Sequence, residues 1–220
     1  GNTLGVFQLE SAGMRVFMKQ LKPDNFEDIV AGISLYRPGP MDSIPTYIEN
    51  KTNPQNVTYL HEKLKPIMEV TYGCLVYQEQ VMQVVRELGG YTYGRSDLVR
   101  RAMGKKKMDV MEEERRYFVY GKEDENGNIE IAGCIRNGVP EDIANQIFDD
   151  MIDFAKYAFN KSHAAAYGVL SYQTAYLKAY YPVEFMAALI TSVMGNTDKV
   201  VEYIRECNAL GIEVLKPDIN

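Results

Sequence analysis

The sequence predicts a mainly α fold: a multi-helix domain with a few short extended segments and one polar loop or hairpin insertion. Two observations lead to this prediction. Most of the longer segments repeat apolar residues every three or four positions, which is the spacing of a helix with one buried face. Several of these segments also start at a residue type that caps helices and end at glycine or proline.

The predicted helices follow one another along the chain. Ser11 is expected to cap the first helix, and Asp24 with Glu27 forms the pattern of a capping box for the second. Tyr36–Pro40 must end the second helix, because each proline removes a backbone donor and restricts the residue before it. Helices are expected at residues 11–21, 24–35, 61–69, 78–88, 97–103, 109–120, 140–157, 164–180, 182–194 and 198–210.

Four segments interrupt the helices. Leu4–Leu9 is a short apolar run that we expect to be extended or buried under its neighbours. Tyr72–Tyr77 is expected to be a brief extended segment, and Asn50–Thr58 is a polar loop. Gly121–Gly138 is rich in glycine and charge, and its Asn126-Gly127 pair favours a hairpin turn. We expect this segment to be a surface insertion.

The bulk composition is that of a soluble globular protein, and no apolar run or signal peptide predicts a membrane protein. The net charge of −6 argues against indiscriminate coating of nucleic acid, but it allows a local basic site on an acidic body. Cys74, Cys134 and Cys207 are too few and too far apart for a disulfide framework or a zinc site. A cytoplasmic location is therefore expected. Because the chain starts at Gly1 and not at methionine, we expect a piece of a longer protein.

Positive charge is concentrated in the thirteen residues Arg95–Lys107. The segment carries a net charge of +5, whereas the remainder of the chain carries −11. Ser96 is expected to cap a helix here, with Gly104 just past its end. The cluster is either a multi-pronged anion site or a solvated basic helix end, which the helix dipole also favours. These two interpretations are evenly balanced on this segment alone.

A second cationic cluster lies at the expected start of the helix at residues 164–180, with Ser162 as a candidate cap. Lys161 and His163 would add charge to the free backbone N–H groups there, which already favour an anion. A capped helix with a surface lysine and a half-buried histidine is the simpler alternative. Arg37 lies on the stiff proline turn, and on local evidence a surface arginine at a simple helix stop is the favoured explanation.

No catalytic motif accompanies these clusters. Val99 stands where a P-loop would need its first glycine, and there is no nucleophile elbow, zinc-protease motif or paired Cys-x-x-Cys. Asp149, Asp150 and Asp153 fit a solvated helix face. The residues therefore indicate binding without evident catalysis.

Longer blocks of sequence point to a family. They are GVFQLESAGM at residues 5–14, YRPGP at 36–40, YGCLVYQEQVM at 72–82, LVRRAMGKKK at 98–107 and FNKSHAAAYGVLSYQTAYLKAYYPVEFMAA at 159–188. These blocks closely resemble the alpha subunits of bacterial replicative DNA polymerase III, which are C-family DNA polymerases. They occur in the family's order and span nearly the whole chain.

The resemblance implies a division of the chain and a function. Residues 1–40 would be the end of the palm and the palm–fingers junction, and residues 41–220 the helical fingers with an insertion at 121–138. The fingers of such a polymerase close over the incoming deoxynucleoside triphosphate (dNTP) and pack on the nascent base pair. Primer–template DNA and dNTPs are the implied partners, along with other replicase subunits such as the sliding clamp through regions outside this piece.

The resemblance also implies roles for particular residues. The residues implied for nucleotide binding are Arg100, Arg101, Lys105, Lys161, His163 and Arg37. Those implied for DNA binding are Lys106, Lys107, Arg95, Tyr77 and Gln78. Tyr77 and Gln78 stand at the entry to a helix, where a packed ring and a cap are the more common roles.

The catalytic carboxylates of the family hold two Mg²⁺ ions and belong to palm motifs that match nothing in this sequence. No catalytic or metal-binding residue is therefore assigned here, and the piece alone is expected to be inactive. Two other functions stay open. The chain could be an autonomous, sequence-independent nucleic-acid-binding module whose basic helix clamps phosphates, or a helical scaffold whose charges are only a solvated face.

Overall fold

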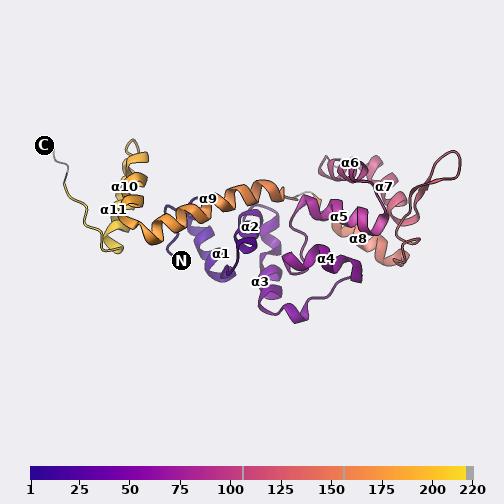
Figure 1. Cartoon of the computed structure of the whole chain (residues 1–220), viewed down its shortest axis with the longest axis horizontal. Helices are drawn as coiled ribbons and strands as arrows, with labels where there is room; N and C mark the ends of the chain where they lie inside the picture. The colour runs from indigo at the N-terminus through magenta and orange to yellow at the C-terminus, as the bar shows by residue number, and fades with distance from the viewer. Residues whose placement is uncertain (106, 156, 217–220) are drawn as a thin grey trace. The chain divides into compact units, whose positions relative to one another are not determined.

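The computed structural model describes residues 1–105, 107–155 and 157–216 and confirms the mainly α prediction (Figure 1). The α-helices are α1 (Ala12–Leu21), α2 (Phe26–Leu35), α3 (Ile44–Thr52), α4 (Lys65–Met68), α5 (Gln78–Gly89), α6 (Tyr93–Gly104), α7 (Met108–Tyr120), α8 (Glu141–Ala155), α9 (Lys161–Tyr180), α10 (Pro182–Ser192) and α11 (Thr197–Ala209). Short 3-10 turns are η1 (Pro40–Ser43), η2 (Pro54–Asn56), η3 (Glu62–Leu64) and η4 (Glu69–Thr71). Strands β1 (Lys122–Glu123) and β2 (Ile129–Ile131) form an antiparallel pair.

The chain divides into two compact units. One comprises Gly1–Ile33 with the chain from Ala165 onward, and the other is Ser34–Ala164. The boundaries fall inside α2 and α9. The division expected at residue 40 between palm and fingers stays a prediction.

The first unit packs α1 on α2 and joins the N-terminal loop to α9. Phe17, Met18 and Leu21 of α1 are buried, and a side chain at Gly32 of α2 would meet Met18. Lys178 of α9 is also buried, with its ammonium group bonded to the Leu4 carbonyl at 2.8 Å and the Glu206 carboxylate at 2.6 Å. This buried ion pair links the N-terminal loop, α9 and α11.

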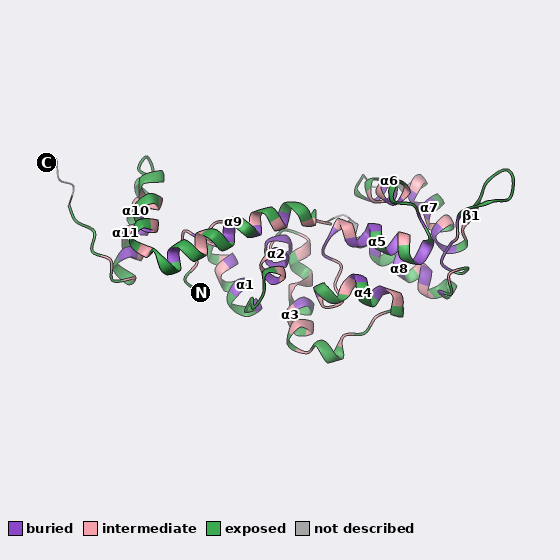
Figure 2. Ribbon diagram, in the orientation of Figure 1, coloured by how far each residue is buried: buried purple, intermediate pink, exposed green. Residues whose placement is uncertain are grey.

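The second unit has a continuous apolar core in which α5 packs against α6, α7 and α8. Figure 2 shows buried positions along these helices and exposed ones at the hairpin loop. Val85 and Leu88 of α5 are fully buried, and the rings of Phe118 and Phe148 lie 5.4 Å apart between α7 and α8. This core fixes the position of α6, the helix that carries the basic segment.

The hairpin predicted from Asn126-Gly127 is confirmed, and Gly127 takes the left-handed conformation that its turn requires, with φ of +79°. The prediction that the whole segment is a surface insertion is wrong. Ile131 and Cys134 belong to the apolar core, and the Cys134 N–H donates to the Phe118 carbonyl at 2.7 Å. Residues 123–130, which include most of both strands, are exposed, whereas Ile131 and Cys134 complete the core beside α7.

Three further details correct the sequence analysis. Leu4–Leu9 is buried as expected at Leu4, Val6 and Leu9, but it folds into consecutive turns and is not extended. Tyr72–Tyr77 starts in a left-handed turn, and in this segment only Tyr77 forms a bridge, with Phe159. The second helix starts at Phe26, and its first turn is capped by Asn25 and not by Asp24: Asn25 Oδ1 accepts the Asp28 N–H, and the Asp28 carboxylate accepts the Asp24 N–H.

Within the described residues, no helix has both the length and the apolar character that crossing a bilayer demands.

We expect Lys178→Ala to lower the free energy of unfolding by about 3 kcal/mol, because it leaves the Glu206 carboxylate and the Leu4 carbonyl without their shared donor. Lys199→Ala is the control, since it removes a lysine whose ion pairs are exposed and costs about 1 kcal/mol or less. Urea unfolding followed by far-UV circular dichroism measures both. Equal losses in the two variants would contradict this view of the Lys178 ion pair.

Candidate phosphate-binding site

Helix α6 starts one turn earlier than the sequence predicted. Thr92 is its N-cap and accepts the Arg95 N–H at 3.3 Å. Ser96, the expected cap, lies inside the helix, is fully buried and donates to the Tyr93 carbonyl at 2.7 Å. Gly104 is the last helical residue and does not lie past the end. Arg100 and Arg101 therefore lie in the last turns of the helix, where its dipole is negative and favours cations.

A pocket of about 190 Å³ opens beside the end of α6. It is lined by Gln78, Val81, Arg100, Arg101, Met103, Gly104, Lys105 and Ala158. Three of the residues that the resemblance implied for nucleotide binding, Arg100, Arg101 and Lys105, thus share one pocket. Val81 and Met103 supply an apolar wall. A small concave site with several cationic donors suits an anion such as a phosphate group.

Arg100 is held by three hydrogen bonds. Its Nε and Nη2 donate to Asp97 Oδ1 at 2.9 and 2.7 Å, and its Nη1 donates to Gln78 Oε1 at 3.0 Å. Arg101 pairs with the other oxygen of Asp97 through its Nε at 2.7 Å, while its side chain remains 62% exposed. One carboxylate therefore anchors both guanidinium groups.

The hydrogen bond from Arg100 lowers the pKa of Asp97, and the charges of Arg100 and Arg101 lower it further. Asp97 is consequently ionised at neutral pH. It neutralises one of the three positive charges at the pocket and leaves a net local charge of about +2 from Arg100, Arg101, Lys105 and Asp97.

The second cationic cluster lies beside the start of α5. Tyr77 and Phe159 form a parallel bridge, and the Gln78 N–H donates to the Phe159 carbonyl at 2.9 Å. The Arg37 guanidinium lies 3.7 Å from the centre of the Phe159 ring, in a cation–π contact. His163 packs edge-on against the same ring at 5.4 Å. Arg37 and His163 thus share Phe159, although they are far apart in sequence.

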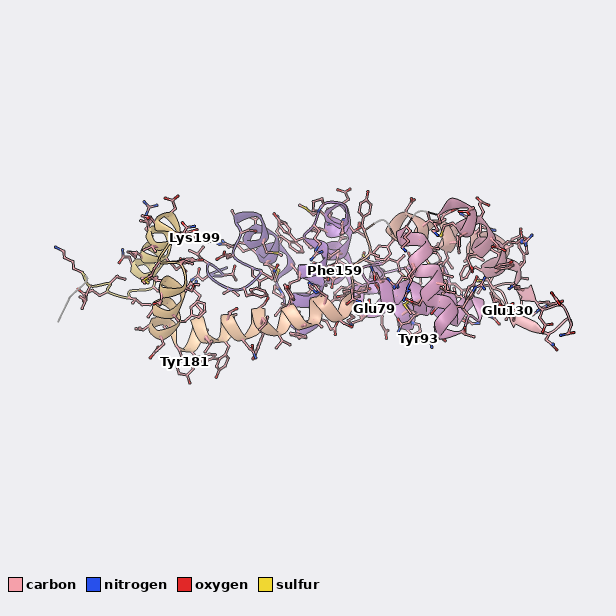
Figure 3. The ribbon with its side chains drawn as sticks, turned by 90° about the horizontal axis from the view of Figure 1, so that it is seen from above. Glu79, Tyr93, Glu130, Phe159, Tyr181 and Lys199 are labelled. Atoms are coloured by element: carbon pink, nitrogen blue, oxygen red, sulfur yellow. The ribbon has the colours of Figure 1, made fainter. Side chains whose placement is uncertain are left out.

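The N-terminus of α9 differs from the expectation. Asn160, and not Ser162, is the side chain that accepts the His163 N–H, at 2.8 Å. Both carboxylate oxygens of Glu79 accept the Lys161 N–H, at 3.1 and 3.0 Å, and Glu79 also accepts a hydrogen bond from the Asn160 amide. Figure 3 labels Glu79 next to Phe159. The anion expected at this helix end is thus a carboxylate of the chain itself.

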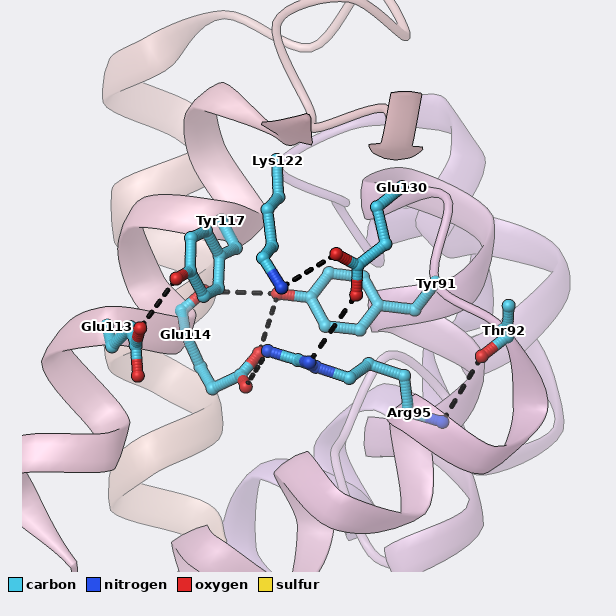
Figure 4. A network of polar contacts seen from close by, with 8 residues as sticks. All are labelled: Tyr91, Thr92, Arg95, Glu113, Glu114, Tyr117, Lys122 and Glu130. Atoms are coloured by element: carbon cyan, nitrogen blue, oxygen red, sulfur yellow. Dashed lines mark hydrogen bonds and ion pairs between the residues drawn. The ribbon is translucent and has the colours of Figure 1, made fainter. Parts of the chain in front are cut away.

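Arg95 lies in a separate polar network (Figure 4). Its Nη2 donates to Glu114 Oε1 at 2.6 Å, and its Nη1 lies 3.7 Å from Glu130 Oε1. Glu114 also accepts from the Tyr91 hydroxyl at 3.0 Å; burial, followed by the Glu114 charge, raises the pKa of that phenol. Lys122 pairs with Glu130 at 2.6 Å within the hairpin, and the contact of Glu130 with Arg95 links the hairpin to α6. A contact of Arg95 with DNA stays a prediction, and it would have to compete with this ion pair.

The network also buries one carboxylate of α7. Glu112 and Glu113 are exposed, but Glu114 is 5% exposed and lies among buried partners. Its ionised form is satisfied by Arg95 and Tyr91, as a buried carboxylate requires.

The remaining predicted residues lie in different surroundings. Tyr77 is the N-cap residue of α5 and is 1% exposed, with the Lys161 ammonium 5.2 Å from its ring centre. Its burial favours the packed-ring interpretation over a base contact. Lys107 is exposed just before α7, and Lys106 lies outside the described residues.

Two other pockets in the same unit do not suit an anion. They have volumes of about 220 and 480 Å³, share Met68 and Asp150, and have no arginine, lysine or histidine among their lining residues. The 480 Å³ pocket also includes Asp42 and Asp153. Of these three pockets in the described residues, the one at the end of α6 is therefore the candidate phosphate site.

The sequence reasoning missed two residues that shape the site. Asp97 could have been found, because it precedes Arg100 and Arg101 by three and four residues, a spacing that places the side chains together on a helix. Glu79 could not, because its partner Lys161 is 82 residues away in sequence.

Comparison with known proteins identifies the family. The model of the bacterial DNA polymerase III alpha subunit finger domain matches residues 1–126. The chain belongs to this family. The match confirms the resemblance seen in the sequence blocks. It includes residues 1–40, which the sequence analysis assigned to the end of the palm; that boundary stays a prediction.

This finger-domain chain is also similar to complete alpha subunits. It is 53% identical over 225 residues to DNA polymerase III subunit alpha of Thermus aquaticus, covering 100% of this chain and 18% of the relative. It is 47% identical over 220 residues to the subunit of Bacillus subtilis, covering 100% of this chain and 19% of the relative. It is 48% identical over 225 residues to the subunit of Escherichia coli K12, covering 99% of this chain and 18% of the relative. The chain thus spans less than a fifth of the length of these relatives.

Membership of this polymerase family implies Mg²⁺ as a cofactor, and a Mg²⁺ site needs ligands from the protein. In the part of this finger-domain chain that the structure describes, no group of three or more His, Cys, Asp or Glu side chains is placed to bind a metal ion. Mg²⁺ needs several oxygen ligands, and the described residues do not provide such a set.

We expect the Asp97 carboxyl to titrate below the ordinary value of about 3.9. Because this pKa is depressed in the folded state, the pairing stabilises the fold above about pH 3.9, and that contribution is lost as the pH falls through the lowered value. In Arg100→Ala the Asp97 pKa should rise toward the ordinary value. Carboxyl-carbon NMR titration measures both, and an unchanged Asp97 pKa in the variant would contradict the pairing.

Proposed function

We propose that this chain is the part of a replicative DNA polymerase that binds the triphosphate of the incoming dNTP and the primer–template. The observation that carries the proposal is the single pocket formed by Arg100, Arg101 and Lys105. The family match supports the same function, since the similar proteins are DNA polymerase III alpha subunits.

The pocket has the chemistry that this function needs. Phosphoryl and nucleotidyl transfer depend mainly on positioning and on stabilising the negative charge of the phosphates. Arg100 is partly buried and fixed by Asp97, so it provides directed donors. Arg101 and Lys105 are exposed, and they would supply positive charge from side chains that can adjust to the position of the phosphates. Lys161, His163 and Arg37 are proposed to complete the nucleotide site.

The DNA contacts are proposed for the exposed basic residues beside the pocket. Lys107 is exposed, and with Lys106 it continues the positive charge beyond α6. Such lysines would bind the sugar–phosphate backbone without reading sequence. Contacts of the whole polymerase with other replicase subunits, such as the sliding clamp, would use regions outside this chain, and its location would be the cytoplasm.

We expect the Arg100→Ala, Arg101→Ala double variant to lose at least about 10-fold in affinity for a fluorescently labelled dNTP, because each charge-assisted hydrogen bond contributes about 1.5–3 kcal/mol. Binding is measured with and without primer–template DNA. The control is Arg116→Ala with Arg136→Ala, which removes the same charge from exposed arginines that do not line the pocket.

Equal losses in the two double variants would contradict a specific triphosphate site. If the chain binds DNA but no nucleotide, and the Arg100, Arg101 variant loses only DNA binding, α6 is a backbone clamp. The chain would then be an autonomous nucleic-acid-binding module.

We also expect the chain alone to form no phosphodiester bonds, because two-metal catalysis needs carboxylates that its described residues do not assemble. The test is primer extension with Mg²⁺, primer–template DNA and all four dNTPs. Extension of the primer by the purified chain would overturn this part of the proposal.

A further inference from the structure

We propose that Gln78 is a positioning residue that sets the orientation of the Arg100 guanidinium and links it to the segment preceding α9. This inference rests on the proposed function, because the purpose of the orientation is to bind a phosphate. Gln78 was expected to contact DNA, but the structure gives its side chain two partners within the protein.

The two partners fix the Gln78 amide in one orientation. Its Oε1 accepts from Arg100 Nη1 at 3.0 Å, and its Nε2 donates to the Ala158 carbonyl at 3.1 Å. The reversed amide would place N–H against a guanidinium and oxygen against a carbonyl, and both contacts would be repulsive. Only glutamine or a side chain of the same length and polarity can satisfy both ends.

Asp97 and Gln78 together leave Arg100 with a defined pair of donors. A guanidinium has five N–H groups, and three of them are used: Nε–H and one N–H of Nη2 by Asp97, and one N–H of Nη1 by Gln78. Among the described residues no acceptor contacts the other two, which are one N–H on each terminal nitrogen. Donors on the two terminal nitrogens of a guanidinium can form a fork that binds two oxygens of one phosphate.

The location of the fork fits this use. Gln78 and Arg100 both line the pocket of about 190 Å³, and the Arg100 side chain is 27% exposed, so a ligand can reach it. Fixing the guanidinium in advance removes part of the entropy cost of ordering a long side chain when the ligand binds. The Gln78 backbone N–H also bonds to Phe159, so the same residue holds the segment that leads to Lys161 and His163.

The test is a double-mutant cycle on the chain with a labelled dNTP as the probe. Gln78→Leu keeps the approximate size of the side chain and removes both hydrogen bonds. We expect it to weaken binding by about 3- to 10-fold, the effect of one lost hydrogen bond. In the Arg100→Ala background the same change should have less than about a 2-fold effect, because there is no guanidinium left to position. Gln55→Leu, at an exposed glutamine of the same unit, is the control.

A second measurement, made without nucleotide, follows the mobility of the Arg100 guanidinium itself. Relaxation of the Arg100 Nε–H signal in NMR should show a restricted guanidinium in the chain and in Gln55→Leu, and a more mobile one in Gln78→Leu. Far-UV circular dichroism verifies that each variant is folded. A general folding defect would weaken binding equally in both backgrounds, so the cycle separates it from loss of positioning.

The outcomes distinguish the two proposals. If Arg100→Ala binds the dNTP as well as the unchanged chain, the proposed triphosphate site is wrong and the inference is wrong with it. If Arg100→Ala weakens binding but Gln78→Leu does not, or the two effects are additive, only the positioning role of Gln78 is overturned. Unchanged mobility of the Arg100 guanidinium in Gln78→Leu would also overturn that role alone.

Discussion

The start of α5 and the segment before α9 are joined by backbone pairing, and the geometry of the cationic site depends on this pairing. The Gln78 N–H donates to the Phe159 carbonyl at 2.9 Å, and the Phe159 N–H lies 3.4 Å from the Val76 carbonyl. The side chain of Gln78 adds a bond to Ala158 and accepts one from Arg100. Without this connection, the basic segment of α6 and the Lys161–His163 cluster would be independent surface features of the unit.

Charge within the site is balanced by carboxylates that the protein itself supplies. Asp97 anchors Arg100 and Arg101, and Glu79 satisfies the Lys161 N–H at the start of α9. Such carboxylates limit the repulsion among neighbouring cations and hold their side chains in place while no ligand is bound. The basic residues of the segment also differ in role. Glu114 holds Arg95 in a structural network, whereas Lys105 lines the pocket.

Local patterns predicted the parts of the fold that depend on neighbouring residues. The helical spacing, the Ser11 cap and the Asn126-Gly127 turn are local signals, and the structure confirms all three. The prediction of Ser96 as the α6 cap was wrong because Ser96 is buried against the core inside the helix, which begins one turn earlier at the cap Thr92. Burial of the hairpin base at Ile131 and Cys134 likewise depends on distant packing against α5 and α7.

The candidate site could be predicted only in part for the same reason. The basic residues of α6 were visible as a charge cluster, and their shared pocket agrees with an anion site. Gln78 bonds to Ala158, 80 residues away, and to Arg100, 22 residues away. Lys161 bonds to Glu79, 82 residues away, so no local pattern could indicate these partners. Sequence therefore identified which side chains carry charge, while tertiary contacts determine which of them are free to bind a phosphate.

We propose that the end of α6 binds phosphate through Arg100 and Arg101, and that Arg95 serves the polar network with Glu114. An NMR titration of the chain with sodium tripolyphosphate, following every arginine Nε–H signal, tests this division. We expect saturable shifts for Arg100 and Arg101 and an unshifted Arg95, because Arg95 is already paired with Glu114. Shifts of equal size for all three arginines, or a shift confined to Arg95, would contradict this division.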